Sequence, residues 1–172
     1  MKRVVTVTVN NNSGVLNRIT GLFAKRQFNI ESITVGPTEN PLVSKMTFIV
    51  PMEDPAKMEQ LLKQLQKQID VLKVSDITDK AIVTRELALV KVLCPPSVRS
   101  EVYSIIEPFR ATVIDMGKNM VTVQITGEPT KVDAFIDLLK PYGIKDISRT
   151  GVTAFVREQQ KQDSPQQSIL QL

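Results

Sequence analysis

A segment near the N-terminus places the strongest constraint on how this chain can fold. Residues Val4–Val9 are a β-branched run in which three valines share one face, a pattern that predicts a strand with one buried side. The loop Asn10–Leu16 follows, and Leu16, Ile19 and Phe23 then recur at the spacing of an amphipathic helix. The chain therefore begins with a strand that passes through a short loop into a helix.

Similar patterns continue along the chain and predict the order β-α-β-β-α-β twice. In the first half, the remaining predicted elements are strands at Ile30–Val35 and Val43–Val50, a helix that begins at Pro55, and a strand at Val71–Ile77. In the second half they are a strand at Leu87–Leu93, a helix over Val98–Phe109, a hairpin of Ala111–Met116 and Met120–Ile125, a helix from Pro129, and a strand at Ile144–Val156 that is interrupted near Gly151. The predicted fold class is α+β, with two ferredoxin-like βαββαβ domains whose antiparallel sheets carry helices on one face.

The domain boundaries are predicted from the same order of elements. Residues 1–78 are expected to form the first domain and residues 79–157 the second, with a polar connector over Ser75–Arg85. Residues 158–172 are rich in Gln, Ser and Asp, and this composition predicts a disordered tail.

The composition excludes several classes of active site. The chain has no histidine, which rules out imidazole metal sites, histidine general bases and Ser–His or Cys–His nucleophile pairs. Cys94, the single cysteine, follows an apolar strand and is expected to be a buried small residue, so neither a catalytic residue nor a metal ligand is predicted. With no internal disulfide, no signal-peptide pattern and no apolar run of membrane-spanning length, the sequence predicts a cytoplasmic protein without a membrane partner.

Nucleic-acid binding is an alternative because RNA-recognition domains share the β-α-β-β-α-β order. Those domains stack bases on aromatic side chains of their central strands. Here the first strand has no aromatic residue, the third has only Phe48, and aromatic residues make up 5% of the chain. The net charge of +4 is also spread over both halves, so we expect no nucleic-acid partner.

The loop after the first strand is the candidate ligand site. Asn12 or Ser13 is expected to cap the helix, and Gly14 allows a ligand to approach the unpaired backbone N–H groups at the helix start. Such a helix start attracts anions, and the amides of Gly14, Val15 and Leu16 could hold the carboxylate of a free amino acid. The simpler alternative is a capped helix with no ligand.

Other residues could complete a site for an aliphatic amino acid. Asn11 and Asn29 carry amide groups that can bond to both a carboxylate and an ammonium group. Leu16 and Ile30 could cover the aliphatic side chain. No cofactor is predicted for this chain.

The ordered set of motifs resembles the small, regulatory subunits of acetolactate synthase, also called acetohydroxyacid synthase. The matching segments are Asn11–Leu16, Gly21–Phe23, Asn29–Ser32, Ser44–Thr47, Gln68–Val74, Arg85–Val92 and Arg149–Gly151. The resemblance implies an N-terminal ACT domain, no catalysis by this chain, and binding to a thiamine-diphosphate-dependent large subunit that also carries Mg²⁺ and FAD. It further implies activation of pyruvate condensation, feedback inhibition by valine in branched-chain amino-acid synthesis, and a homodimer through ACT domains.

In the family the effector lies between two ACT domains. The resemblance implies that Asn11, Gly14, Val15 and Leu16 come from one chain, and that Asn29 and Ile30 come from the other. The chain departs from the family where Gln27 replaces a glycine, Lys45 an arginine and Asn10 an acidic residue. The alternative is an ACT-type sensor of another amino acid that is not tied to acetolactate synthase.

Overall fold

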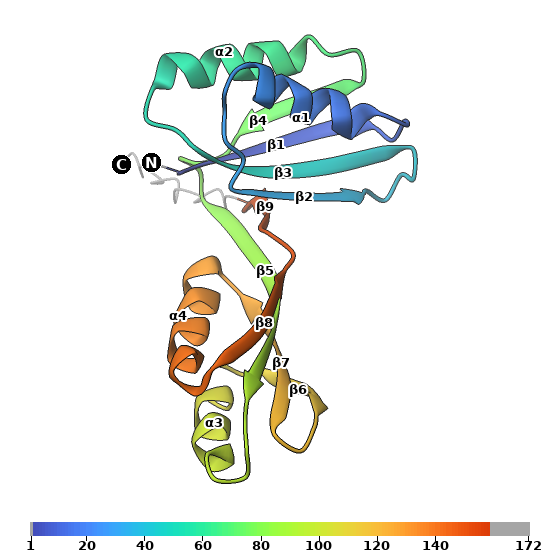
Figure 1. Ribbon diagram of the computed structural model, residues 1–172. Helices are drawn as coiled ribbons and strands as arrows, with labels where there is room; N and C mark the ends of the chain where they lie inside the picture. The colour runs from blue at the N-terminus through green and yellow to red at the C-terminus, as the bar shows by residue number, and fades with distance from the viewer. Residues whose placement is uncertain (1, 159–172) are drawn as a thin grey trace, which may run out of the picture.

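The computed structural model describes residues 2–158, which form two sheets, each with two helices on one face (Figure 1). The predicted pair of ferredoxin-like βαββαβ domains is therefore confirmed. The disordered tail predicted for residues 158–172 lies outside the described residues, apart from Glu158. Within residues 2–158, no helix has the length and apolar composition needed to cross a bilayer.

The first domain contains a four-stranded antiparallel sheet. Its elements are β1 (Lys2–Asn10), α1 (Val15–Lys25), β2 (Ser32–Pro37), β3 (Val43–Pro51), α2 (Pro55–Gln66) and β4 (Val71–Asp76). The strands lie in the order β2-β3-β1-β4, so β2 and β4 form the two edges of this sheet. The second strand begins at Ser32, two residues later than predicted, and ends at Pro37.

The alternating valines of β1 form the centre of the first core. Val5, Val7 and Val9 are at most 1% exposed and pack beneath α1 and α2. Phe23 of α1 stacks on Phe48 of β3 with a distance of 4.8 Å between ring centroids. The predicted strand with one buried face is therefore confirmed, and its opposite face carries threonines.

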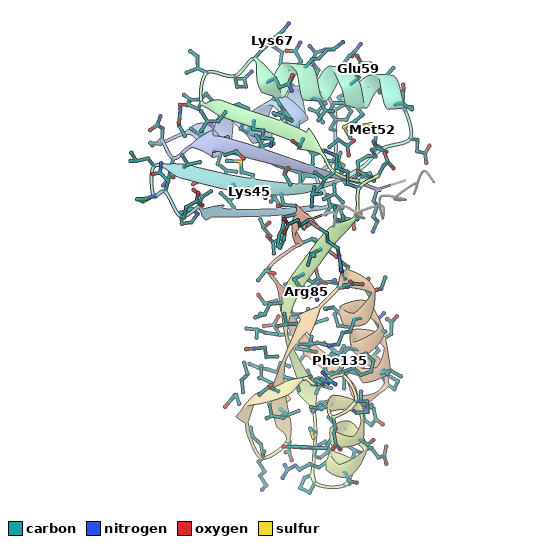
Figure 2. The ribbon with its side chains drawn as sticks, turned by 180° about the vertical axis from the view of Figure 1, so that it is seen from behind. Lys45, Met52, Glu59, Lys67, Arg85 and Phe135 are labelled. Atoms are coloured by element: carbon teal, nitrogen blue, oxygen red, sulfur yellow. The ribbon has the colours of Figure 1, made fainter. Side chains whose placement is uncertain are left out.

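The second domain repeats this plan. Its elements are β5 (Ile82–Leu93), α3 (Arg99–Ile106), β6 (Thr112–Met116), β7 (Met120–Gly127), α4 (Pro129–Leu139), the short helix η1 (Lys140–Tyr142) and β8 (Ile144–Arg149), and its sheet has the order β6-β7-β5-β8. Phe135 of α4 is fully buried in the core between this helix and the sheet (Figure 2). Cys94 is also buried, as predicted.

A strand pair links the two domains. β9 (Thr153–Val156) pairs with the first four residues of β5, Ile82–Arg85, and lies beneath the first sheet (Figure 1). The prediction of a polar connector up to Arg85 is therefore wrong for its last four residues. These four residues form a strand because they pair with β9, which lies about 70 residues later in the sequence, so local spacing could not predict the strand. The predicted interruption near Gly151 separates β8 from β9.

Candidate functional site

The loop between β1 and α1 has a different helix start from the one predicted. Gly14 is the residue that precedes the first turn of α1, and its φ of 82° lies in the left-handed region that glycine tolerates best. Within residues 2–158 no side chain caps α1, so the predicted cap by Asn12 or Ser13 is wrong. A Cβ at Gly14 would meet no described atom within 4 Å, because the loop faces open space.

The side chain of Asn12 makes no capping bond to α1 and instead bonds to a distant residue. Its Nδ2 donates to Asp70 Oδ1 at 2.9 Å, and Arg18 of α1 pairs with the other oxygen of the same carboxylate. Asp70 precedes β4 and is 7% exposed. The carbonyl oxygen of Asp70 also accepts from Asn10 N at 2.8 Å, so this residue holds the loop on its β4 side.

Asn11 holds the loop on its other side. Its backbone N donates to Leu42 O at 2.8 Å, and its Nδ2 donates to Pro41 O at 3.0 Å. The loop between β2 and β3 is thereby joined to the loop before α1. Among residues 2–158 no donor bonds to the side-chain oxygen of Asn11, while its Nδ2 already bonds to Pro41 O.

The first turn of α1 presents backbone donors at the end of the domain. Val15 N reaches Asn12 O only at 3.4 Å, and within residues 2–158 no acceptor bonds to Leu16 N. The Val15 side chain is 4% exposed and anchors α1 in the core, whereas the Leu16 side chain is 45% exposed beside these donors. An anion could therefore accept hydrogen bonds here, next to an apolar surface.

Asn29 and Ile30 lie at the opposite end of the domain from this loop. They follow the C-terminus of α1, and a helix of 11 residues is about 16 Å long. Asn29 is exposed and Ile30 packs partly against the first core. The start of α1 and the segment between α1 and β2 lie at opposite ends of the first domain (Figure 1). One chain therefore brings Asn11, Gly14, Val15 and Leu16 together but leaves Asn29 and Ile30 apart from them.

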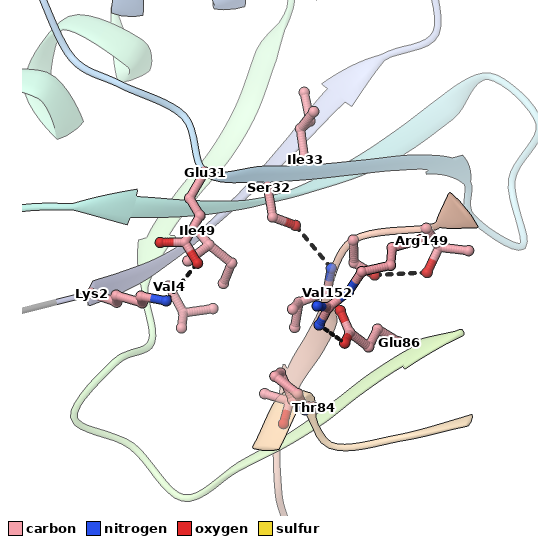
Figure 3. A pocket seen from close by; sticks show the side chains of 13 residues that line it. Lys2, Val4, Glu31, Ser32, Ile33, Ile49, Thr84, Glu86, Arg149 and Val152 are labelled. Atoms are coloured by element: carbon pink, nitrogen blue, oxygen red, sulfur yellow. Dashed lines mark hydrogen bonds and ion pairs between the residues drawn. The ribbon is translucent and has the colours of Figure 1, made fainter. Parts of the chain in front are cut away.

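A cleft between the two domains contains none of the six predicted site residues. It has a volume of about 550 Å³ and lies between the open face of the first sheet and the connector from β8 to β9 (Figure 3). Val152 N donates to Ser32 Oγ at 3.0 Å, and Thr34 Oγ1 donates to Val152 O at 2.9 Å. These two bonds join β2 to the second domain.

The charged groups in this cleft are already paired with one another. Lys2 Nζ lies 2.6 Å from Glu31 Oε1, and Arg149 pairs with Glu86, which is 4% exposed (Figure 3). Arg149 also lies 2.8 Å from Asp133. Burial lowers the pKa of Arg149, but its bonds to the two carboxylates raise that pKa above the usual value, so the guanidinium stays charged. Among residues 2–158, no three acidic or thiol side chains come together as a metal site.

Sequence reasoning missed the role of Asp70 and of the connector around Gly151. Asp70 and Gly151 both fall within segments that carry the family resemblance, and this resemblance was the only indication in the sequence that they matter. Their partners, Asn12 and Ser32, are 58 and more than 100 residues away along the chain, so spacing could not identify them.

Comparisons with known proteins agree with this architecture. Residues 5–73 match the model for the ACT domain of acetohydroxyacid synthase small subunits, and residues 85–158 match the model for the small subunit of acetolactate synthase. The chain is 60% identical over 169 residues to the acetolactate synthase small subunit of Bacillus subtilis, covering 98% of both chains. It is 46% identical over 161 residues to a probable acetolactate synthase small subunit of Archaeoglobus fulgidus, covering 94% of this chain and 100% of that one.

A solved structure shows the same arrangement of both domains. The crystal structure of the acetolactate synthase small subunit from Thermotoga maritima matches with a TM-score of 0.84 at 37% identity, covering 92% of this chain and 99% of that chain. The two family models lie in the two domains described above, and together with these relatives they cover almost the whole described chain. The chain therefore belongs to the family of acetolactate synthase small subunits.

Proposed function

We propose that this chain is the regulatory subunit of acetolactate synthase and that it binds valine at the start of α1. In this account it binds the large catalytic subunit, raises its activity and makes it sensitive to valine. Thiamine diphosphate, Mg²⁺ and FAD belong to the large subunit, and this chain performs no catalysis. The observation that carries the proposal is the exposed first turn of α1, with Gly14 in a left-handed conformation, in a member of this family.

The chemistry of the loop suits the carboxylate of an amino acid. Charge-assisted hydrogen bonds contribute about 1.5–3 kcal/mol each, and the helix dipole adds about 0.3–1 kcal/mol. Leu16 provides an exposed apolar surface for an aliphatic side chain. Since association and ordering oppose these terms, we expect micromolar to millimolar affinity, which suits a sensor of a metabolite.

A second copy of the chain supplies Asn29 and Ile30 in this proposal. Among the described strands β2 pairs only with β3, so its other side is open for pairing. If two β2 strands pair in antiparallel fashion across a two-fold axis, the start of one strand lies beside the end of the other. The end of β2 is also the end of the domain that carries the α1 loop, because Asn11 bonds to Pro41 and Leu42. Asn29 of the second copy would then face Gly14 of the first.

Gly14→Asp tests the anion site. The new carboxylate would repel the carboxylate of valine at the α1 amides. The new side chain meets no described atom within 4 Å, and the left-handed φ of Gly14 adds a strain of about 1–2 kcal/mol. We expect the variant to activate the purified large subunit normally and to lose inhibition in a valine titration. The same titration with leucine and isoleucine identifies the preferred effector.

Gly14→Asn is the matched control for this variant. Asparagine has nearly the same size and tolerates the left-handed conformation about as well as aspartate, but it carries no charge. We expect Gly14→Asn to keep more valine inhibition than Gly14→Asp. Normal valine inhibition of Gly14→Asp would place the effector elsewhere, and failure of the wild-type chain to respond to valine, leucine or isoleucine would refute the proposed function.

A further inference from the structure

Asp70 is a buried carboxylate that contacts three parts of the loop before α1. It is 7% exposed, and its two carboxylate oxygens bond to Asn12 Nδ2 and to the guanidinium of Arg18. Its backbone carbonyl accepts from Asn10 N at 2.8 Å. A single residue immediately before β4 therefore contacts the last residue of β1, the middle of the loop and the first turns of α1.

These contacts fix the direction in which the α1 amides point. Arg18 N donates to Gly14 O at 3.0 Å, so the Arg18–Asp70 pair holds the turn in which Gly14 is left-handed. The bond to Asn12 keeps that side chain away from the helix start, where it would otherwise be able to cap the free donors. Without this bond, the Asn12 amide oxygen could occupy the position proposed for the effector carboxylate.

We infer that Asp70 is a positioning residue for the effector: it withdraws Asn12 from the α1 donors and orients those donors toward the ligand. The inference rests on the proposed function, because it assigns a role at the same site. Asp70 does not touch the effector itself. Its contribution is to keep the donors unoccupied before the ligand arrives, which lowers the cost of ordering the site on binding.

Asp70→Asn removes the charge that pairs with Arg18 and leaves Asn12 Nδ2 a neutral acceptor in place of a charged one, which weakens the bond that holds Asn12. It keeps the size of the side chain and the backbone bond to Asn10. We expect valine to bind the purified full-length variant about tenfold more weakly in calorimetry, as for the loss of one charge-assisted hydrogen bond. Replacing Asn12 by alanine in the same chain (Asn12→Ala/Asp70→Asn) should recover part of this affinity, since the side chain that competes for the donors is then gone. A purely structural role would not give this recovery.

Asp76→Asn is the matched control at the opposite end of β4. Asp76 is also a partly buried aspartate that pairs with an arginine, Arg3, with 2.6 Å between Nη2 and Oδ2. Burial raises the pKa of Asp76, but bonds from Thr78 and Arg3 more than offset this and hold its pKa below the usual value. Each of the two carboxylates pairs with an arginine, so removal of either charge should lower the thermal unfolding temperature, whereas only Asp70→Asn should weaken valine binding.

The outcomes separate the two claims. If wild-type chain binds no branched-chain amino acid, the proposed function fails and the role of Asp70 fails with it. If wild-type binds valine, and Asp70→Asn binds it equally well or Asp76→Asn weakens it equally, then the role of Asp70 is refuted while the proposed function stands. Selective weakening with recovery in Asn12→Ala/Asp70→Asn supports the inference.

Discussion

The residues that flank α1 at its two ends both adopt a left-handed backbone conformation. Gly14 before the helix and Gln27 after it both have positive φ, at 82° and 57°. The first is a glycine, for which this conformation is readily accessible, and the second is not. The resemblance places a glycine where Gln27 stands, and the φ of Gln27 lies in the left-handed region that glycine adopts most easily at the end of a helix.

Gln27→Gly should therefore stabilise the chain. A left-handed conformation costs a residue other than glycine about 1–2 kcal/mol, and the greater freedom of glycine in the unfolded state offsets about half of this gain. We expect a net increase of about 0.5–1 kcal/mol in the free energy of unfolding, measured by urea denaturation. Arg26→Gly is the control, because Arg26 has a φ of −96° and should lose stability on the same change. Equal effects at the two positions would contradict this explanation.

The residue scale also shows why the helix cap could not be predicted. Asn12 and Ser13 have the right side chains for capping, and local reasoning can weigh only those neighbours. The structure instead pairs Asn12 with Asp70, which lies 58 residues later. The uncapped backbone donors at the start of α1 follow from the local Gly14–Leu16 segment, so they could be predicted even though the cap was wrong.

At the scale of elements, the strands and helices were predictable wherever one face is buried. The valines of β1 and the apolar stripes of α1, α2 and α4 gave the correct element types because their spacing reflects a local geometry. The first part of β5 was missed because it becomes a strand through pairing with β9. The contact between β9 and the first sheet was unpredictable for the same reason.

A substitution at Gly151 tests the contact between the β8–β9 connector and β2. Its φ is 84°, and a Cβ there would lie 2.6 Å from Ser32 Oγ and 3.1 Å from Ile33 O, a backbone atom that cannot rotate away. Gly151→Ala should lower the free energy of unfolding by about 1–3 kcal/mol in urea denaturation, from backbone strain and from weakening of the bonds between Val152 and β2.

Gly21→Ala provides the control for this prediction. Gly21 lies inside α1, and a methyl group added there would meet no described atom within 4 Å. Alanine should therefore raise the free energy of unfolding by about 0.5–1 kcal/mol through its helix propensity. If Gly151→Ala leaves stability unchanged while Gly21→Ala raises it, the connector does not pack against β2 as described.

At the scale of the whole molecule, the proposed contact between two copies and the contact between the two domains involve the same strand, β2. β2 carries Ser32 and Thr34, which bond to Val152 of the second domain, and its free edge is the proposed meeting point of two copies. A ligand that favours one geometry of the paired ACT domains would therefore also act on the strand that holds the second domain. Its effect can be no larger than its difference in affinity for the two geometries.

The proposal that two copies share one site leads to a direct test with mixed dimers. Gly14→Asp chains have a defective anion site in the loop before α1 but keep Asn29. Asn29→Ala chains lack the Asn29 side chain that completes the site but keep Gly14. Each variant alone should bind little valine. After the two are unfolded together and refolded, half of the dimers should be mixed, and each mixed dimer has one intact site of two.

Calorimetric titration of this mixture with valine measures the central claim. If two chains share each site, the mixture should recover about a quarter of the wild-type binding capacity, at wild-type affinity, although each variant alone is defective. A site built within one chain predicts no recovery at all. A mixture that binds no more valine than the separate variants, while mass spectrometry shows that mixed dimers have formed, would contradict the account.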